Sequence, residues 1–303
     1  MLSINTNAAS MAAVNAINKS NASLSQSMER LATGKRINSS ADDAAGKQIA
    51  NRMQTQSDGM AMAQRNIADA TAMLQTADGM FDEMNDILGR MDELATQAAN
   101  GTYSDDDRTA MQSEFDELGQ EMSDMLQNTT NGGTNLFNKS ENGLFTSASG
   151  VTFQVGSQST DQITINISSQ VSQLATDLGT LSAAFSSDYG TDGAGGASAS
   201  GTAGSELMTL DSANATISAV QGVMDEVGSI QSTLGATMNR LSSTSTNLQS
   251  MQDNTEVAIG NIMDTDYATE ASNMSKQQVL MQTGITMLKQ ANSMSGMVSS
   301  LLQ

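Results

Sequence analysis

The 303-residue chain contains no cysteine, histidine, proline or tryptophan, and these absences exclude several kinds of chemistry. Without Cys there is neither a disulfide framework nor a thiolate nucleophile. Without His, the Ser-His-Asp and Cys-His catalytic arrangements and the Cys/His zinc sites are excluded. The sequence also lacks the P-loop, GxGxxG and GxSxG motifs, so we expect a protein that is not an enzyme and needs no cofactor. The absence of proline favours long, uninterrupted helices, because proline breaks them.

Acidic residues outnumber basic ones by 33 to 13, which gives a formal net charge of −20. A chain of this charge repels phosphate, so we expect neither nucleic-acid binding nor attachment to anionic membranes. No stretch approaches the ~18 apolar residues of a transmembrane helix. The first ten residues, MLSINTNAAS, lack the basic and apolar regions of a secretory signal peptide. The sequence therefore predicts a protein that is cytosolic or is exported without such a signal.

Residues that build a hydrophobic core are scarce. Leu, Ile, Val and Phe make up 52 of the 303 residues, and 23 methionines raise that number to 75. Methionine packs adaptively and can replace leucine in helical seams. We therefore expect a chain that folds only partly alone and completes its burial against partners.

Apolar residues recur with a heptad period along residues 49–98, 111–125 and 210–248. Such stripes are typical of coiled-coil packing. The sequence therefore predicts a mainly α fold, a long antiparallel coiled-coil-like helix bundle formed by the N- and C-terminal halves. In the third stripe the predicted core positions are Leu210, Ala213, Ile217, Val220, Met224, Val227, Gln231, Leu234, Met238, Leu241, Ser245 and Leu248.

The middle of the chain follows a different pattern. Apolar and polar residues alternate over 151–155 and 163–167, which predicts a small β-hairpin near 150–168. The TTNGGTN segment at 129–135 is a turn cluster that ends the second helix. Residues 186–206, rich in Gly, Ala and Ser, form either a flexible connection or an exposed loop whose hydroxyls carry O-linked sugars. The candidate glycosylation sites are Ser186, Ser187, Thr191, Ser198, Ser200 and Thr202.

The two ends of the chain share the same chemistry. Residues 1–18 and 290–303 carry no charged side chain, and each belongs to an apolar helical stripe. Such helices are not stable in water as isolated elements. One interpretation is a helix pair that caps the chain's own bundle; we favour a core shared by many copies. The predicted polymerisation core comprises Val14, Ile17, Leu24, Met28, Leu31, Met281, Ile285, Leu288, Val298 and Leu301.

Two acidic motifs invite a metal or acid–base interpretation. Asp42 and Asp43 follow two serines, a pattern that is more typical of a helix N-cap. Asp264 and Asp266 lack the further oxygen ligands of a calcium loop. We therefore predict no metal site.

Four segments resemble bacterial flagellins. The chain starts with SINTN at 3–7, and residues 29–46, ERLATGKRINSSADDAAG, are similar to the family's ERLSSGxRINSAxDDAAG block. Residues 264–280, DTDYATEASNMSKQQVL, resemble its C-terminal block. The last residues, VSSLLQ, are close to the family's VLSLL ending, although many members end in Arg where this chain has Gln303. With the helical segments between them, these blocks cover all but the middle of the chain.

The resemblance implies a structural subunit that polymerises head-to-tail into the flagellar filament used for motility, with terminal helices that order on assembly. Hook–filament junction proteins share such helices and are the alternative; the 264–280 block favours the subunit. Residues 1–44 and 258–303 would form an inner terminal-helix domain, the filament core. Residues 45–185 and 207–257 would form an outer rod domain. The 186–206 loop stands where many flagellins carry variable β-rich domains.

The resemblance also implies partners and a route out of the cell. Flagellins are exported unfolded by the flagellar type III apparatus, without a cleaved signal peptide, to the extracellular filament. Besides further copies of itself, the chain would bind a flagellin export chaperone and the hook-associated and cap proteins. Toll-like receptor 5 recognises some flagellins. Arg90, Leu94 and Glu114 match the recognised type, whereas Asp92 replaces a base by an acid.

Overall fold

The computed structural model describes residues 7–138, 143–182, 184–185 and 204–301, with only the helical backbone described for 295–301. The chain forms two compact units. We call residues 1–58 with 251–303 the terminal unit and residues 59–250 the central unit. The domain boundaries expected after residue 44 and before residue 258 both fall inside the terminal unit.

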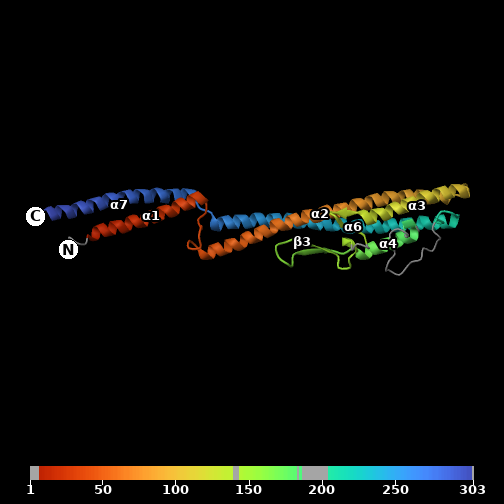
Figure 1. Cartoon of the computed structure of the whole chain (residues 1–303), viewed down its shortest axis with the longest axis horizontal. Helices are drawn as coiled ribbons and strands as arrows, with labels where there is room; N and C mark the ends of the chain where they lie inside the picture. Colours follow the sequence, from red (N-terminus) through yellow and green to blue (C-terminus); the bar gives the residue numbers. More distant parts are fainter. Residues whose placement is uncertain (1–6, 139–142, 183, 186–203, 302–303) are drawn as a thin grey trace. The chain divides into compact units, whose positions relative to one another are not determined.

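Helices make up most of the described chain, which confirms the predicted mainly α, antiparallel bundle (Figure 1). Two of them, α2 and α6, contribute residues to both units. No described helix combines the length and the apolarity needed to span a membrane. The helices are α1 (Ala8–Thr33), α2 (Ala44–Ala98), α3 (Asp105–Asn128), α4 (Ser168–Leu181), α6 (Leu210–Met263) and α7 (Tyr267–Leu301).

In the central unit, α2 and α6 run antiparallel. The Gln64 side chain donates to Gln249 at 3.2 Å, and Asn85 donates to Gln231 at 3.1 Å. The predicted stripe on α2 is fully buried from Met60 onward, whereas its first predicted member, Ile49, is exposed. A second buried row makes the apolar face of α2 wider than a single coiled-coil seam, as expected of a helix that packs against several neighbours. This row consists of Met73, Met80, Ile87 and Leu94.

The stripe on α6 differs from the prediction at every second position. Ala213, Val220 and Val227 are buried as predicted, whereas Leu210, the first predicted member, is exposed. The alternating positions lie one residue earlier than expected, so that Val223, not Met224, is fully buried. The predicted residues at these places are half-buried, because the buried face of α6 is centred slightly to one side of the predicted seam. The earlier positions that are buried are Thr216, Val223, Ile230 and Thr237.

The connection between α2 and α3 is fixed by polar contacts. The Ser104 hydroxyl caps α3 by accepting from the Asp107 backbone N–H, and the Asp107 carboxylate accepts from the Ser104 N–H at 3.0 Å. This capping box satisfies helix N-terminal donors. The buried Arg108 guanidinium donates to the carbonyl oxygen of Ala98 at the end of α2 and to that of Tyr103 at 3.2 Å. A cation suits the negative end of a helix dipole.

Two small hairpins follow α3. In the first, β1 (Thr130–Asn131) pairs with β2 (Thr134–Asn135) across Gly132 and Gly133, which both have positive φ. Two such residues suit the tight turns of two-residue hairpins, so the predicted turn cluster is confirmed, with strands that we did not expect. The second is the predicted hairpin, in which β3 (Val151–Gln154) pairs with β4 (Gln162–Ile165).

Aromatic contacts join the stretch between the two hairpins to α2. The ring of Phe137 lies 5.2 Å from Phe81 in an edge-on arrangement and 5.4 Å from Phe145 in a stacked one. Phe145 belongs to the short 3-10 helix η1 (Leu144–Thr146). All three rings are buried. They form the aromatic centre of the central unit.

Candidate assembly surface

The terminal unit is built on the antiparallel pair of α1 and α7 (Figure 1). Asn7 caps α1 by accepting from the Ser10 N–H, and its amide group donates to the carbonyl oxygen of Ala291 on α7 at 3.1 Å. Gly284 lies against Ile17, where an added Cβ would sit 2.8 Å from the nearest side-chain carbon. Glycine therefore allows a close approach of the two helices.

The structure divides the predicted polymerisation core. Leu24 is buried, and Ile17, Leu31, Met281 and Leu288 are partly covered. The remaining described members point outward: Val14, Met28 and Ile285 are exposed. Val298 and Leu301 lie in the part of α7 for which only the backbone is described.

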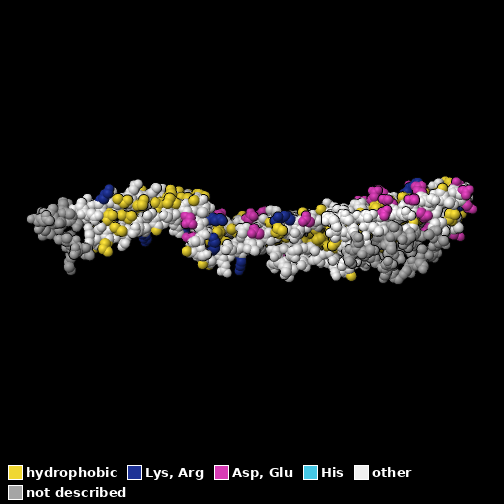
Figure 2. All heavy atoms as spheres, viewed as in Figure 1, with side chains coloured by type: hydrophobic (Ala, Val, Ile, Leu, Met, Phe, Trp, Pro, Cys, Tyr) yellow, Lys and Arg dark blue, Asp and Glu magenta, His cyan; other side chains and the backbone are white. Residues whose placement is uncertain are grey.

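Further apolar side chains, which the heptad stripe did not include, are also exposed on these two helices. Val279 and Met287 are more than 60% exposed, at 61% and 63%. Figure 2 shows hydrophobic side chains gathered along this helix pair. Apolar residues at several angles around an uncharged segment are the sequence signal that would have identified them. The terminal apolar surface, as we name it, comprises Met11, Val14, Met28, Tyr267, Val279, Leu280, Ile285, Met287 and Met294.

The two units differ sharply in charge. The terminal unit has eight basic and nine acidic residues, a formal net charge of −1. The central unit has five basic and 24 acidic residues, a net charge of −19. Charge repulsion therefore opposes close packing of many copies only weakly for the terminal unit and strongly for the central unit.

The two sequence blocks at 29–46 and 264–280 meet at the base of the helix pair. Gly34 ends α1 in the left-handed conformation, with φ 72°, and its carbonyl accepts from the Thr265 N–H at 3.0 Å. The Arg36 N–H donates to Met263, and its guanidinium donates to Ile262 at 2.8 Å. These backbone hydrogen bonds hold the end of α1 beside the start of α7 and so fix the register of the helix pair.

Acidic side chains complete this junction. Asp42 accepts from the Ser39 N–H of the loop at 2.9 Å and from the Gln26 side chain of α1 at 2.8 Å. These hydrogen bonds, with Ser39 the larger cause, lower the pKa of Asp42 to about 2. Arg30 lies 3.9 Å from Asp42 and 3.8 Å from the buried Glu270. Asp42 thus ties the α1–α2 loop to α1.

The neighbouring aspartates act as helix caps. Asp43 caps α2 by accepting from the Gly46 N–H at 2.9 Å, which confirms the predicted cap for this residue. Asp42, in contrast, contacts the α1–α2 loop and α1 and does not cap α2. Asp266 caps α7 by accepting from the Ala268 N–H at 2.9 Å and from the Thr269 hydroxyl. Among the described residues, no group of three or more Asp and Glu is placed to hold a metal ion.

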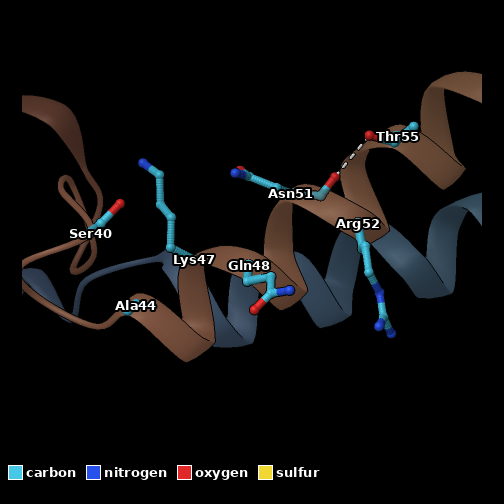
Figure 3. A pocket seen from close by; sticks show the side chains of 7 residues that line it. All are labelled: Ser40, Ala44, Lys47, Gln48, Asn51, Arg52 and Thr55. Carbon is cyan, nitrogen blue, oxygen red and sulfur yellow. Dashed lines mark hydrogen bonds between the residues drawn. The ribbon is translucent and has the colours of Figure 1, made fainter.

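A shallow groove of about 350 Å³ runs beside the start of α2 (Figure 3). Its side chains diverge: Lys47 and Arg52 point away from each other on opposite sides of the helix (Figure 3). Lys47 also donates to the carbonyl oxygen of Asn38 at 2.9 Å, so it supports the α1–α2 loop. The groove gathers no acid–base pair. It is lined by Ser40, Ala44, Lys47, Gln48, Asn51, Arg52 and Thr55.

The candidate receptor residues lie in the central unit. Arg90 and Glu114 form an exposed ion pair at 2.7 Å, which joins α2 to α3, and Arg90 also pairs with Glu93 at 2.9 Å. These pairs raise the pKa of Arg90. Leu94 is only 2% exposed and belongs to the core. The candidate glycosylation sites within 186–202 lie outside the described residues.

Comparison with known proteins relates both ends of the chain to bacterial flagellins. Residues 4–142 match the bacterial flagellin N-terminal helical region, and residues 217–302 match the C-terminal helical region. The chain is 32% identical over 301 residues to a flagellin of Listeria monocytogenes, with 99% of both chains covered. It is 41% identical over 168 residues to polar flagellin F of Vibrio parahaemolyticus, with 55% of this chain and 43% of the other covered. In fold alone it resembles a structure described as a flagellar hook-associated protein of V. parahaemolyticus, at 15% identity and TM-score 0.58, covering 74% of this chain and all of the other.

Proposed function

Because the chain belongs to the bacterial flagellin family, we propose that it is a structural subunit that polymerises head-to-tail through its terminal unit into the flagellar filament. The observation that carries this proposal is the coincidence of exposed apolar side chains with near-neutral charge on α1 and α7. A head-to-tail interface that does not close generates an open helical polymer. The hook–filament junction alternative is less supported, because a relative that aligns over 99% of both chains is a flagellin.

Terminal helices that gain order on assembly fit this arrangement. Among the described side chains of α1 and α7, only Leu24, Ser27 and Glu270 are buried in the single chain, so little burial opposes the entropy cost of ordering these helices. Contacts with neighbouring copies would supply the rest. The net charge of −20 makes copies repel one another, so salt should favour assembly.

The test is repolymerisation of heat-dissociated protein. Purified monomer is cooled, given salt and seeded with filament fragments, then examined by negative-stain electron microscopy and circular dichroism. Long uniform filaments with a gain of helix support the proposal. Deletion of residues 290–303 should leave a folded central unit that does not polymerise, and filaments of this variant would refute the role of α7. Deletion of residues 191–201, outside the terminal unit, is the matched control and should polymerise normally.

The finer partner assignments are also proposals. The chain leaves the cell unfolded through the flagellar type III apparatus, bound beforehand by a flagellin export chaperone at its C-terminal helix. It contacts hook-associated and cap proteins at the ends of the filament. The uncharged C-terminal stretch supports chaperone capture, since it needs cover before assembly. A co-purification of chaperone with the full chain, lost on deletion of 290–303, tests this.

Recognition of the monomer by Toll-like receptor 5 would use the exposed Arg90–Glu114 pair, with Leu94 supporting it from the core. Asp92 departs from the recognised type and weakens the contact. Binding of the monomer to the receptor ectodomain should fall for Arg90→Ala and rise for Asp92→Arg. Equal binding by all three proteins would contradict this surface.

A further inference from the structure

Methionine is the most easily oxidised side chain in this protein. The chain has 23 methionines and no cysteine or tryptophan to compete for an oxidant. Thioether oxidation yields a polar sulfoxide and disrupts methionine-rich interfaces. The position of each methionine relative to solvent therefore decides what an oxidant does to this molecule.

Four exposed methionines lie on the terminal apolar surface. Met11 and Met287 are 61% and 63% exposed, and Met28 and Met294 are 49% and 55% exposed. By contrast, methionines of the central core, among them Met84, are fully buried. Accessibility thus separates the terminal sites from the core sites within one chain.

We propose that Met11, Met28, Met287 and Met294 are oxidation sites at which peroxides block assembly of the free subunit. This inference rests on the proposed function. In the reaction, peroxide transfers one oxygen atom to the thioether sulfur Sδ. The S–O bond forms as the O–O bond breaks, the sulfur loses two electrons, and the peroxide is reduced to water.

The consequence follows from the location of the four sulfurs. Each sulfoxide turns an apolar contact of the assembly surface into a polar group that must be desolvated when a neighbouring copy covers it. Oxidation of the free subunit therefore prevents polymerisation. In the filament the same sulfurs are covered by neighbours, so assembled protein is protected.

The experiment compares free subunits and filaments exposed to the same pulse of hydrogen peroxide. Peptide mass spectrometry gives the oxidation rate of each methionine, and sedimentation gives the polymerised fraction. In the free subunit, the four terminal methionines should oxidise much faster than Met60, Met84, Met91 and Met122, which serve as internal controls. In the filament they should be protected. The critical concentration of oxidised subunits should rise roughly tenfold or more, in line with a loss spread over four contacts.

Two variants locate the effect. The fourfold Met→Leu variant at 11, 28, 287 and 294 keeps apolar side chains but has no thioether to oxidise at these positions. Its own untreated critical concentration is the reference, and peroxide should leave that value unchanged. The matched control carries Met62→Leu, at an exposed methionine of the central unit, and should remain sensitive.

Several results would overturn the inference. It fails if the four sites oxidise no faster than core methionines, if filaments are not protected, or if the fourfold variant is as sensitive as the wild type. If untreated subunits do not polymerise at all, it is the proposed function that fails. The rates in the free subunit then still decide whether these four are the oxidation sites.

Discussion

Val279 offers a quantitative test of the terminal apolar surface. It is 61% exposed on α7 in the single chain, so its substitution should change the monomer's free energy of unfolding by less than about 0.5 kcal/mol. Val279→Ala removes two methyl groups, worth about 1.6 kcal/mol when fully buried. The exposed share of this gain, about 1 kcal/mol, is left for a neighbouring copy to supply. The critical concentration for polymerisation should therefore rise about fivefold.

The assay measures the monomer left in the supernatant after seeded assembly and sedimentation. Gln278→Ala is the control: it changes the preceding residue, which is also exposed, removes little apolar surface and should leave the critical concentration unchanged. Val279→Glu places a charge where a neighbour must cover it, so it should not polymerise even at about ten times the wild-type concentration. Polymerisation of Val279→Glu at the wild-type critical concentration would show that this side of α7 stays in solvent, and the reasoning would be refuted.

Three other predictions concern the units themselves. Phe81→Leu and Phe137→Leu, combined in a double-mutant cycle by urea unfolding, should give a coupling of about 0.5–1.5 kcal/mol from their edge-on contact. Gly34→Ala should lower the melting temperature of the terminal unit, because it costs about 1 kcal/mol at positive φ and its Cβ would lie 3.1 Å from the Tyr267 hydroxyl oxygen. The lowered pKa of Asp42 gives stability that is present above pH ~4 and is lost as the pH falls toward 2. Burial and the neighbouring carboxyl of Asp177 raise the pKa of Glu226, so the stability that protonated Glu226 contributes is lost as the pH rises. Acid titration followed by NMR should therefore show loosening at the α1–α2 loop but not at Glu226.

Periodicity predicted the buried residues best where the buried face is wide. On α2, each stripe position from Met60 to Ala98 is buried, because the face is wide enough to include both this stripe and the second row that starts at Met73. On α6, Val223 and Met224 are both apolar, and the pattern alone does not say which one faces the core. That choice depends on the angle at which α6 meets its neighbours, which the sequence does not encode locally.

Two elements escaped prediction although signals for them exist. Helix α4 buries Val171, Leu174, Leu178 and Leu181, whose spacing of three, four and three residues is helical. The first hairpin has Asn131 before two glycines, a strong turn signal. Both are short, and neighbouring polar residues such as serine and threonine weaken their intrinsic preference.

The candidate site was predicted only in part. A heptad stripe finds residues that face a partner helix, and one of its members, Leu24, is buried within the single chain. It does not find exposed apolar residues that point away from the partner helix, such as Val279 and Leu280, because those lie off the stripe. An interface among many copies surrounds a helix, and its pattern therefore has no single period.

The unequal charge of the two units has a consequence for the polymer as a material. If terminal units form its core, every added subunit brings a net charge of −19 on its central unit and nearly none at its axis. Such a polymer is a linear polyanion, surrounded by an atmosphere of mobile cations. At low ionic strength neighbouring filaments would hold one another apart, and multivalent cations, which condense most strongly, would draw them into bundles.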